Sequence, residues 1–476
     1  MKRILSLPVL LLAAIFVANA KVELPPIFAD NMVLQQQTDA ALWGKAEPGK
    51  KVTITTTWSK AKVTVTAGED GKWLARVATP SAGGPYEITF NDGDKLTLRN
   101  VLIGEVWICS GQSNMEMQMK GFSGQPVKGA ADLIMTAKPS TPIRSCNLKR
   151  VKALDPQDTC EATWYEHTPE GVFEASATAY FFARKLYEVL QIPVGIINVS
   201  WGGTPIEAWM NPELLKKEFA GELKLGHLDS KVWPEKNPYK APGVLYNGMM
   251  HSVVPFTAKG FIWYQGCDNR KRFEQYKKLQ PAFVQMLRDE WGNQDMGFYF
   301  TQIAPYKYED PDLPHGGYMM WAQAQTLAMI PHSGMATTHD AGELACIHPA
   351  DKKTVGDRLA YLALSKDYGY DIFEVDPPIY KSFEVKDGEA LVTFEVGKKG
   401  LCPISTELDG FELAGEDKVF YPAKARVAKN RNILRVRCPE VPDPVAVRYG
   451  MKNWSEATVF NCFGIPVSPF RTDNWE

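Results

Sequence analysis

The feature that most constrains this sequence is a regular alternation of short apolar runs and longer amphipathic segments between residues 100 and 370. The short runs are typical of buried strands, and the longer segments place apolar side chains at helical spacing. Such a chain forms a parallel sheet covered by helices on both faces, so the predicted fold class is α/β. The predicted strands are 106–109, 194–199, 261–264, 297–300 and 335–338, and the predicted helices are 173–190, 273–291, 319–329 and 354–364.

The segments on either side of this region have strand patterns without helical spacing. Residues 21–99 contain short β-branched runs separated by glycine turns, and they predict a small N-terminal β-sandwich. Residues 371–476 contain alternating runs such as 390–396, and they predict a β-rich C-terminal part that packs on the α/β domain. A chain of 476 residues is too long for one compact core, so we expect domains at 21–99, 100–370 and 371–476.

The first twenty residues have the pattern of a cleavable signal peptide. Lys2 and Arg3 precede an apolar run over 4–17, and Ala18-Asn19-Ala20 provides the small residues of a cleavage site. This run is short for a membrane span, and no later stretch is long and apolar enough to cross a membrane. We predict cleavage of residues 1–20 and a periplasmic or secreted protein without a membrane span. A buried N-terminal strand and an uncleaved anchor are the alternative interpretations.

The charge balance gives no reason to expect a nucleic-acid partner. The sequence contains 53 Lys and Arg residues against 55 Asp and Glu residues, which gives a formal net charge of −2. Nucleic-acid-binding proteins instead concentrate basic residues that neutralise phosphates. The eight cysteines show no paired CxxC spacing, so the sequence also predicts no zinc site.

Four small, polar or glycine-rich loops follow predicted strands. Ligands of open α/β sheets bind beyond the carboxyl ends of the strands, so these loops are expected to meet at one site. One such loop would be weak evidence, whereas four after successive strands indicate a functional centre. They cover residues 110–115, 200–204, 265–269 and 339–349.

The residues in these loops are those that acyl transfer requires: a nucleophile, a base and donors for an oxyanion. Ser113 is the candidate nucleophile, and its own amide and that of Gly203 are candidate oxyanion donors. The side-chain amides of Gln265 and Asn269 could complete the hole. The alternatives are an N-cap serine, an ordinary glycine turn and amides that only stabilise their loops.

His348 is the candidate general base. It is one of seven histidines, and only its place in the last of the four loops distinguishes it. The following Pro349 favours an extended backbone at His348. A single histidine is usually structural or exposed, so its assignment depends on the other loops.

Taken together, these motifs resemble the sialate O-acetylesterase family of the SGNH-hydrolase superfamily. Gly111-Gln112-Ser113-Asn114-Met115 is similar to the nucleophile block of that family, and Trp201-Gly202-Gly203-Thr204 to its glycine block. Trp263-Tyr264-Gln265-Gly266 and Ile347-His348-Pro349 are similar to the third block and the histidine block. Residues 30–35 and 468–473 also resemble family segments, so the likeness spans nearly the whole mature chain.

The resemblance implies a three-layer α/β/α domain that hydrolyses O-acetyl esters on sugars, with 9-O-acetylated sialic acid as the leading substrate. Ser113 would attack the acetyl carbonyl, and His348 would take the serine proton and later activate water. The amides of Ser113 and Gly203, with a side-chain amide from the third block, would hold the oxyanion. The partner would be an O-acetylated glycan, and no metal or organic cofactor would be needed.

The chain departs from the family pattern at the position of the orienting acid. Cys267 stands where the family commonly has Glu, and Cys346 stands where it commonly has Asp, two positions before the histidine. The acid that would orient His348 is therefore open. Asp340 is the candidate that we carry forward, with Glu343 and a backbone carbonyl as alternatives.

The two departures suggest a disulfide hypothesis. Both cysteines lie in predicted active-site loops, and an exported protein can form disulfides. A Cys267–Cys346 bridge would tie the third block to the histidine loop and help to fix His348. The alternative is two small buried thiols, because cysteine pairing cannot be deduced from sequence.

The identity of the sugar stays open, because the motifs report acyl chemistry and not the alcohol. Acetylated xylan or another plant glycan is an alternative to sialic acid. A catalytically weak glycan-binding protein is the alternative of another class, favoured by the missing Glu and Asp and by the two β-rich parts. The presence of Ser113, Gly203 and His348 argues for an enzyme.

Overall fold

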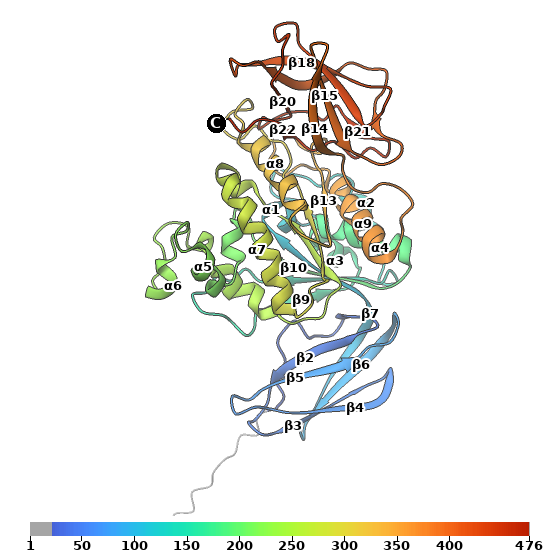
Figure 1. Cartoon of the computed structure of the whole chain (residues 1–476). Helices are drawn as coiled ribbons and strands as arrows, with labels where there is room; N and C mark the ends of the chain where they lie inside the picture. The colour runs from blue at the N-terminus through green and yellow to red at the C-terminus, as the bar shows by residue number, and fades with distance from the viewer. Residues whose placement is uncertain (1–20, 476) are drawn as a thin grey trace, which may run out of the picture.

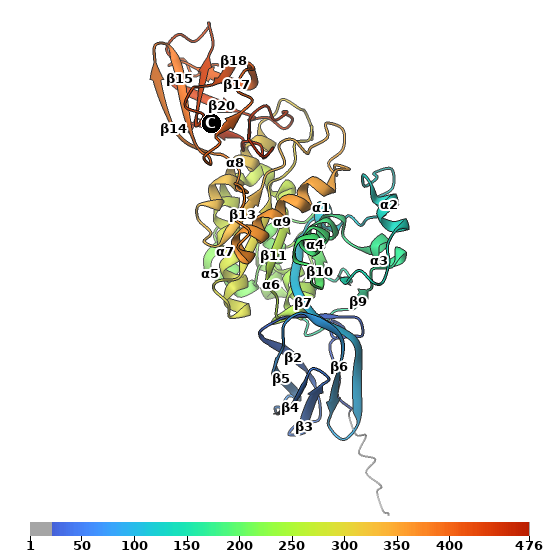
Figure 2. The ribbon, with the colours of Figure 1, turned by 90° about the vertical axis from the view of Figure 1, so that its right-hand side faces the viewer.

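The computed structural model of the chain describes residues 21–475, so the predicted signal peptide at 1–20 lies outside the described residues. The described chain is elongated, with N-terminal strands at one end, a mixed helix-and-sheet part in the middle and a β-rich part at the other end (Figures 1 and 2). Among the described residues, no helix combines the length and the apolar character that a membrane span requires.

The middle of the molecule is built on a mostly parallel sheet with strand order β13-β12-β11-β7-β10-β8-β9. Every pair along this order is parallel except the antiparallel pair at the β9 edge. The parallel sheet confirms the α/β fold class that the alternating pattern predicts. The strands are β7 (Lys95–Gly111), β8 (Ile143–Leu148), β9 (Ala162–Tyr165), β10 (Val194–Ser200), β11 (Gly260–Tyr264), β12 (Gly297–Thr301) and β13 (Ser333–Ala336).

Helices cover both faces of this sheet. Alternate strand residues point to opposite sides, so each face packs against its own helices. On β7, Trp107 and Cys109 pack in one apolar cluster with α4 and α9, whereas Val106 and Ile108 pack in another with α7. The helices are α1 (Ser113–Glu116), α2 (Ala130–Met135), α3 (Pro169–Glu174), α4 (Ala177–Leu190), α5 (Pro212–Phe219), α6 (Gly226–Ser230), α7 (Phe273–Trp291), α8 (His315–Leu327) and α9 (Lys352–Tyr368). Shorter helical turns are η1 (Ile206–Trp209), η2 (Pro238–Lys240), η3 (Tyr246–Met250), η4 (His251–Val253) and η5 (Cys267–Arg272).

The ends of α9 are set by its sequence. The Asp351 side chain caps the first turn by accepting a hydrogen bond from the Thr354 amide at 3.0 Å. The helix stops at Gly369, whose φ of 73° is the left-handed conformation that favours glycine. The cap places Lys352 in the first turn of α9, directly after the histidine loop.

The N-terminal part contains two groups of strands and is joined to the middle part by β7. All its strand pairs are antiparallel except β1 with β7, which is parallel. The first half of β7 pairs with β6 and β1, and its second half pairs with β10 and β11, so one strand runs through both parts (Figure 1). The N-terminal strands are β1 (Val33–Gln35), β2 (Asp39–Lys45), β3 (Lys51–Thr56), β4 (Ser59–Thr66), β5 (Lys72–Ala78) and β6 (Gly83–Asn91). Strands β2 and β5 form a separate two-stranded sheet.

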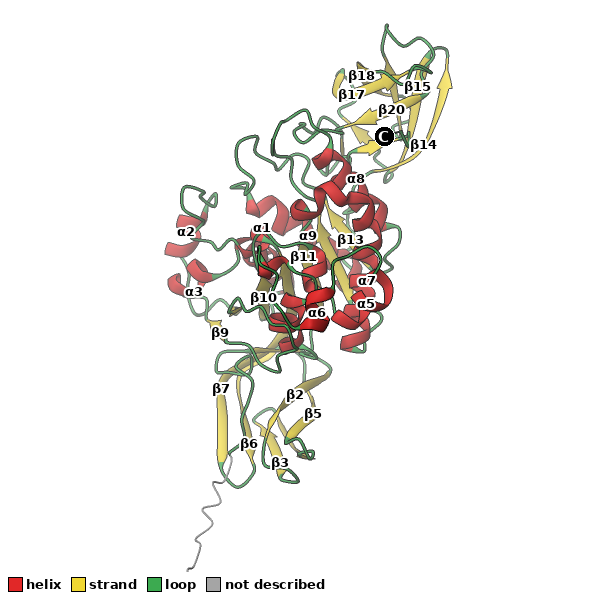
Figure 3. Cartoon of the chain, turned by 90° about the vertical axis from the view of Figure 1, so that its left-hand side faces the viewer, coloured by secondary structure: helices red, strands yellow, loops and turns green. Residues whose placement is uncertain are grey.

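The C-terminal part is β-rich, as predicted, and consists mainly of a seven-stranded sheet with order β14-β15-β19-β18-β17-β20-β22 (Figure 3). It is tied to the α/β part by polar contacts, including a 2.7 Å bond from Nε2 of Gln302 to the Ser468 hydroxyl. The strands are β14 (Ile379–Lys386), β15 (Glu389–Glu395), β16 (Leu401–Cys402), β17 (Leu408–Ala414), β18 (Phe420–Val427), β19 (Ile433–Arg437), β20 (Ala446–Tyr449), β21 (Phe460–Asn461) and β22 (Phe470–Arg471).

Candidate active site

Ser113 and His348 meet at the carboxyl end of the parallel sheet. Ser113 is the first residue of α1, directly after β7, and its Oγ lies 2.7 Å from Nε2 of His348. Gly111 has a φ of 140° and lies so close to the backbone of Tyr264 on β11 that a Cβ atom would collide with it. The glycine therefore allows β7 to end in close contact with β11, and it places the serine at the carboxyl end of the sheet.

The other nitrogen of the His348 ring faces a glutamine. Oε1 of Gln125 lies 2.6 Å from Nδ1 of His348. Because an amide oxygen only accepts, the ring carries its proton on Nδ1 and offers the lone pair of Nε2 to the Ser113 hydroxyl. This is the protonation state that a general base needs. Sequence reasoning missed Gln125, which lies in a loop without any periodic signal.

The loop between α1 and α2 holds Gln125 in place. Phe122 and Gln125 exchange backbone hydrogen bonds of 3.0 and 2.9 Å. The Phe122 ring also packs edge-on against the His348 imidazole, with 5.1 Å between ring centroids. One short loop therefore supports His348 through both a hydrogen bond and an aromatic contact.

The surroundings of His348 keep its imidazole uncharged. Burial disfavours the charged ring, and the positive charge of Lys352 adds to this effect, so that the pKa of His348 falls to about 4. A neutral imidazole at ordinary pH can accept a proton from Ser113.

Asp340, the predicted orienting acid, does not contact His348. Its two carboxylate oxygens accept hydrogen bonds of 2.6 and 2.7 Å from the guanidinium of Arg358 on α9. A bidentate pair of this kind uses both oxygens of the carboxylate. The prediction that Asp340 orients the imidazole is therefore corrected, because Gln125 occupies that position. Glu343, the alternative, accepts a 2.7 Å bond from the Ala350 amide.

The glycine loop lies directly against the serine. A Cβ atom on Gly202 would come within 2.6 Å of Oε2 of Glu116 and 3.1 Å of Cβ of Ser113. The Gly202 amide donates to Glu116 at 2.7 Å, so it is already used. The amides of Gly203 and Ser113 donate to no acceptor within residues 21–475. These two amides are therefore free to bind an oxyanion, and that role stays a prediction.

Gln265 and Asn269 have different contacts from those predicted. Both are fully buried, and Nε2 of Gln265 donates to the Thr204 carbonyl at 3.1 Å and to Oδ1 of Asn269 at 2.7 Å. Nδ2 of Asn269 donates to Glu207 at 2.9 Å, and its oxygen also accepts from the Ile206 amide. Both N–H groups of Gln265 are occupied, and the bonded N–H of Asn269 is directed to Glu207. The prediction of Gln265 as an oxyanion donor is corrected, because its two N–H groups join the second and third loops. The role of Asn269 stays a prediction, because its second N–H has no acceptor within the described residues.

Gln112 is a side-chain amide that the prediction overlooked, although it lies within the nucleophile motif. Its Oε1 accepts a 3.0 Å hydrogen bond from the Gly266 amide, and this contact fixes the side chain between the first and third loops. Its Nε2 has no acceptor within the described part of the chain. Gln112 therefore has a donor to spare directly beside Ser113.

The predicted disulfide is not formed. All eight cysteines lie within the described residues and are free thiols. The Cys346 thiol points to the His348 carbonyl at 3.2 Å, within its own loop. Cys267 is buried, and this burial raises the pKa of its thiol. The structure thus agrees with the alternative of two separate thiols.

Three basic side chains near the second and third loops each have a carboxylate partner. Trp201 and Tyr239 stack beside the glycine loop, with 5.4 Å between ring centroids and planes 10° apart. The cations near this aromatic pair and the third loop are therefore compensated. The pairs are Arg150–Glu116 at 2.8 Å, Lys240–Asp268 at 2.6 Å and Arg270–Glu309 at 2.5 Å. No group of three or more His, Cys, Asp or Glu residues that could hold a metal ion occurs within residues 21–475.

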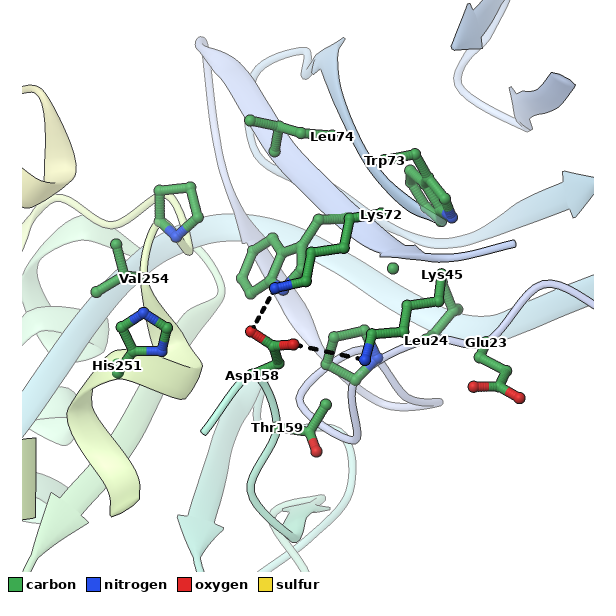
Figure 4. A pocket seen from close by; sticks show the side chains of 14 residues that line it. Glu23, Leu24, Lys45, Lys72, Trp73, Leu74, Asp158, Thr159, His251 and Val254 are labelled. Atoms are coloured by element: carbon green, nitrogen blue, oxygen red, sulfur yellow. Dashed lines mark hydrogen bonds and ion pairs between the residues drawn. The ribbon is translucent and has the colours of Figure 1, made fainter. Parts of the chain in front are cut away.

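A large cavity lies away from Ser113. It has a volume of about 480 Å³ and lies between the N-terminal strands and the middle part (Figure 4). Trp43 and Trp73 line it, and Asp158 there pairs with Lys72 at 2.8 Å and with Lys45 at 3.4 Å. None of the residues that line this cavity belongs to the four loops, so the serine centre lies elsewhere.

Comparisons with known proteins agree with the geometry. Residues 103–365 match the model of a family described as carbohydrate esterase, sialic acid-specific acetylesterase. The chain is 31% identical over 396 residues to human sialate O-acetylesterase, which covers 75% of this chain and 73% of the human protein. It is 28% identical to the mouse sialate O-acetylesterase, with 93% of each chain covered.

A solved structure is also similar over almost the whole chain. The structure of a novel carbohydrate acetylesterase from Xanthomonas citri matches with a TM-score of 0.86 and 31% identity, covering 96% of this chain and all of the other. The matched family segment contains all four loops, with Ser113 and His348 in them. The chain therefore belongs to the sialic acid-specific acetylesterase family of carbohydrate esterases, and it is a carboxylic ester hydrolase that removes O-acetyl groups from carbohydrate.

Proposed function

We propose that this esterase uses Ser113 as its nucleophile, His348 as its general base and Gln125 as the residue that orients the histidine. The observation that carries the proposal is the chain of two short hydrogen bonds from Ser113 to His348 and from His348 to Gln125. A nucleophile, a base and a third group that orients the base are the recurring parts of a serine hydrolase.

In the first half of the reaction, Nε2 of His348 accepts the hydroxyl proton while Oγ of Ser113 bonds to the acetyl carbonyl carbon. The resulting tetrahedral intermediate collapses, the bond to the sugar oxygen breaks, and His348 returns the proton to that oxygen. The sugar leaves with a free hydroxyl, and the acetyl group stays on Ser113.

In the second half, His348 takes a proton from a water molecule that attacks the acetyl-serine carbonyl. The second tetrahedral intermediate then expels Oγ of Ser113, which receives the proton from His348, and acetate leaves. The backbone amides of Ser113 and Gly203 stabilise the oxyanion of both intermediates, because neither has another acceptor. The free N–H of Gln112 is the third candidate donor.

Gln125 differs from a carboxylate in one respect that matters for the rate. Its amide oxygen selects the right tautomer and orientation of the imidazole, but it carries no charge to stabilise the imidazolium that forms during attack. The low pKa of His348 fits this neutral environment.

Two sugars compete as the natural alcohol. The family description and the names of the human and mouse relatives favour O-acetylated sialic acid, which is our first candidate. A neutral acetylated glycan such as xylan is the second candidate, because Arg150, Lys240 and Arg270 are each already paired with a carboxylate. No unpaired cation among these three is left for the carboxylate of a sialic acid.

Two measurements test the proposed function. The first compares wild type and Ser113→Ala on p-nitrophenyl acetate, where we expect the variant to lose about 10⁶-fold in kcat, on the order of what removal of a serine nucleophile costs. Equal rates would rule out Ser113 as the nucleophile. The second measures acetate release from acetylated sialosides and acetylated xylo-oligosaccharides, and the sugar with the higher kcat/KM identifies the substrate class.

The protein is also proposed to be exported after removal of residues 1–20. The support is the positively charged start, the apolar run and the Ala18-Asn19-Ala20 motif. Mass spectrometry of the protein from its native cells tests this, with Lys21 as the expected N-terminus and an intact Met1 as the contrary result.

The mature chain is proposed to comprise three parts, at 21–99, 100–370 and 371–476, with an N-terminal β-sandwich and a three-layer α/β/α esterase domain. Two mostly antiparallel strand groups in the first part and helices on both faces of the parallel sheet support this arrangement.

A further inference from the structure

Lys352 carries a buried amine that the proposed chemistry does not use. The residue is 1% exposed, and Nζ donates a hydrogen bond to Oδ1 of Asn114. No carboxylate lies within ion-pairing distance of Nζ within the described residues. Because a lysine is almost never fully buried without an anionic partner, its position beside the serine requires an explanation.

Four acidic groups lie near Lys352, but none of them forms an ion pair with its amine. They come from the histidine loop, η5 and the start of α9, and they are Cys346, Glu343, Cys267 and Asp351. Glu343 accepts from the Ala350 amide, and Asp351 accepts from Thr354. Burial outweighs their attraction and lowers the pKa of Lys352 to about 7.

Lys352 fixes the orientation of the Asn114 side chain. An ammonium group can only donate, so the amide oxygen of Asn114 must face Lys352 and its NH₂ group must face the opposite side. On that side Nδ2 donates to the Ile347 carbonyl at 3.0 Å. Asn114 follows Ser113 in the chain and Ile347 precedes His348, so this amide ties the turn of the nucleophile to the loop of the base.

We propose that Lys352 is a positioning residue of this esterase, which holds Ser113 and His348 in register through Asn114 and keeps His348 uncharged through its own positive charge. The inference rests on the proposed roles of Ser113 and His348. The proposal explains why Lys352 lies beside Ser113 and why no carboxylate within the described residues pairs with it. A carboxylate paired with the lysine would cancel the effect of its positive charge on the imidazole.

Three substitutions separate the two effects. Lys352→Met removes the donor and the charge, Lys352→Gln keeps a donor without the charge, and Lys352→Arg keeps both. Lys353→Met is the matched control, because Lys353 is the next residue of the same helix and its exposed amine pairs with Asp357. Thermal melts and circular dichroism identify any variant that fails to fold, and Lys352→Gln then carries the test of the charge.

The measurements are kcat and KM on p-nitrophenyl acetate and the pH profile of kcat/KM, whose acid limb reports the base of the free enzyme. For Lys352→Met we expect kcat to fall by about 10- to 100-fold with little change in KM, because the reacting groups lose their register. We also expect the acid limb to move up by about half a pH unit or more in the Met and Gln variants, because a positive charge near His348 is gone. Lys352→Arg should leave the limb in place, and Lys353→Met should behave as wild type.

Two results would overturn the inference. One is a folded Met or Gln variant whose acid limb stays at the wild-type pH, which would leave Lys352 with a purely structural role. The other is a folded Met variant with wild-type kcat. Failure of the proposed function is distinguishable from both, because it appears as residual activity of Ser113→Ala, in which Lys352 is intact.

Discussion

The side-chain oxygen of Gln125 lies 2.6 Å from Nδ1 of His348, so an uncharged amide orients the imidazole that faces Ser113. The two residues are 223 positions apart in the chain. The site thus has the hydrogen-bonded geometry of a catalytic triad, but its third residue, Gln125, carries no negative charge. Several consequences of this arrangement can be measured.

Replacing Gln125 should separate orientation from charge. Gln125→Ala removes the acceptor at Nδ1, and we expect kcat to fall by about 10- to 100-fold, less than the roughly 10⁴-fold effect of a wrong tautomer. Gln125→Glu restores an acceptor with a negative charge, so it should retain activity and raise the pKa of His348. The check is kcat and the pH profile of kcat/KM, and a fully active Gln125→Ala would show that the ring needs no partner there.

Asp340→Asn should affect stability rather than catalysis. The substitution breaks a bidentate pair with Arg358, whose side chain is only 10% exposed, and we expect a loss of about 1–3 kcal/mol in the free energy of unfolding. The value of kcat should stay within about threefold of wild type, because Asp340 does not touch His348. Denaturant unfolding and steady-state kinetics measure the two effects, and a large loss of kcat in a stable variant would return Asp340 to the catalytic site.

The two neighbouring glycines should differ in their response to alanine. A Cβ atom on Gly202 would press on Glu116 and Ser113, so Gly202→Ala should lower kcat by about 10- to 100-fold. Gly203 has open space around it, with nothing nearer than 3.9 Å to an added Cβ, and a φ of 66°. Gly203→Ala should therefore cost about 1 kcal/mol of stability from backbone strain, with a smaller loss of kcat. Kinetics and melting curves of the pair decide this, and the reverse order of the kcat losses would contradict it.

The pH dependence should follow the low pKa of His348. Burial and Lys352 disfavour the imidazolium, so the base form persists as the pH falls from 7 to about 5 and is lost around the pKa of about 4. An acid limb of kcat/KM near pH 6.5, the ordinary value for histidine, would argue against this environment. The same shift makes the folded state less stable as the pH falls from about 6.5 towards 4, because only the unfolded chain then binds the proton.

Thiol titration should find all eight cysteines free. The protein is denatured without reductant and its thiols are counted, and dithiothreitol should leave kcat unchanged. A count of six would indicate one disulfide, and peptide mapping would then show whether Cys267 and Cys346 form it.

The fold could be predicted where the sequence has a strong period. Helix α7 matches the predicted range 273–291, because its apolar side chains recur at helical spacing over nineteen residues. The continuous course of β7 could not be predicted, because its first half is partly exposed and its second half is buried at every position, so the two halves have different patterns. The strand changes partners along its length, and Asn100 within it has a φ of 55°.

The site could be predicted only as far as residue types and strand ends allow. Ser113 and His348 follow strands in recognisable motifs, and the structure brings them together. Gln125 has no such signal, because its role depends on how a loop folds back. Gln265 and Asn269 have amides of the right kind, but only the neighbouring Glu207 and Thr204 reveal which way they point. Asp340 is close to His348 in sequence, yet Arg358 on α9 holds its carboxylate.

The course of strand β7 determines which truncations of the protein can fold. It begins in the N-terminal part at Lys95 and ends at Gly111, two residues before the nucleophile. Deleting the N-terminal strands would therefore leave the central strand of the parallel sheet without the partners that hold its first half. We therefore expect that the N-terminal part cannot be removed without unfolding the sheet that carries Ser113. We also expect both parts to unfold in one transition.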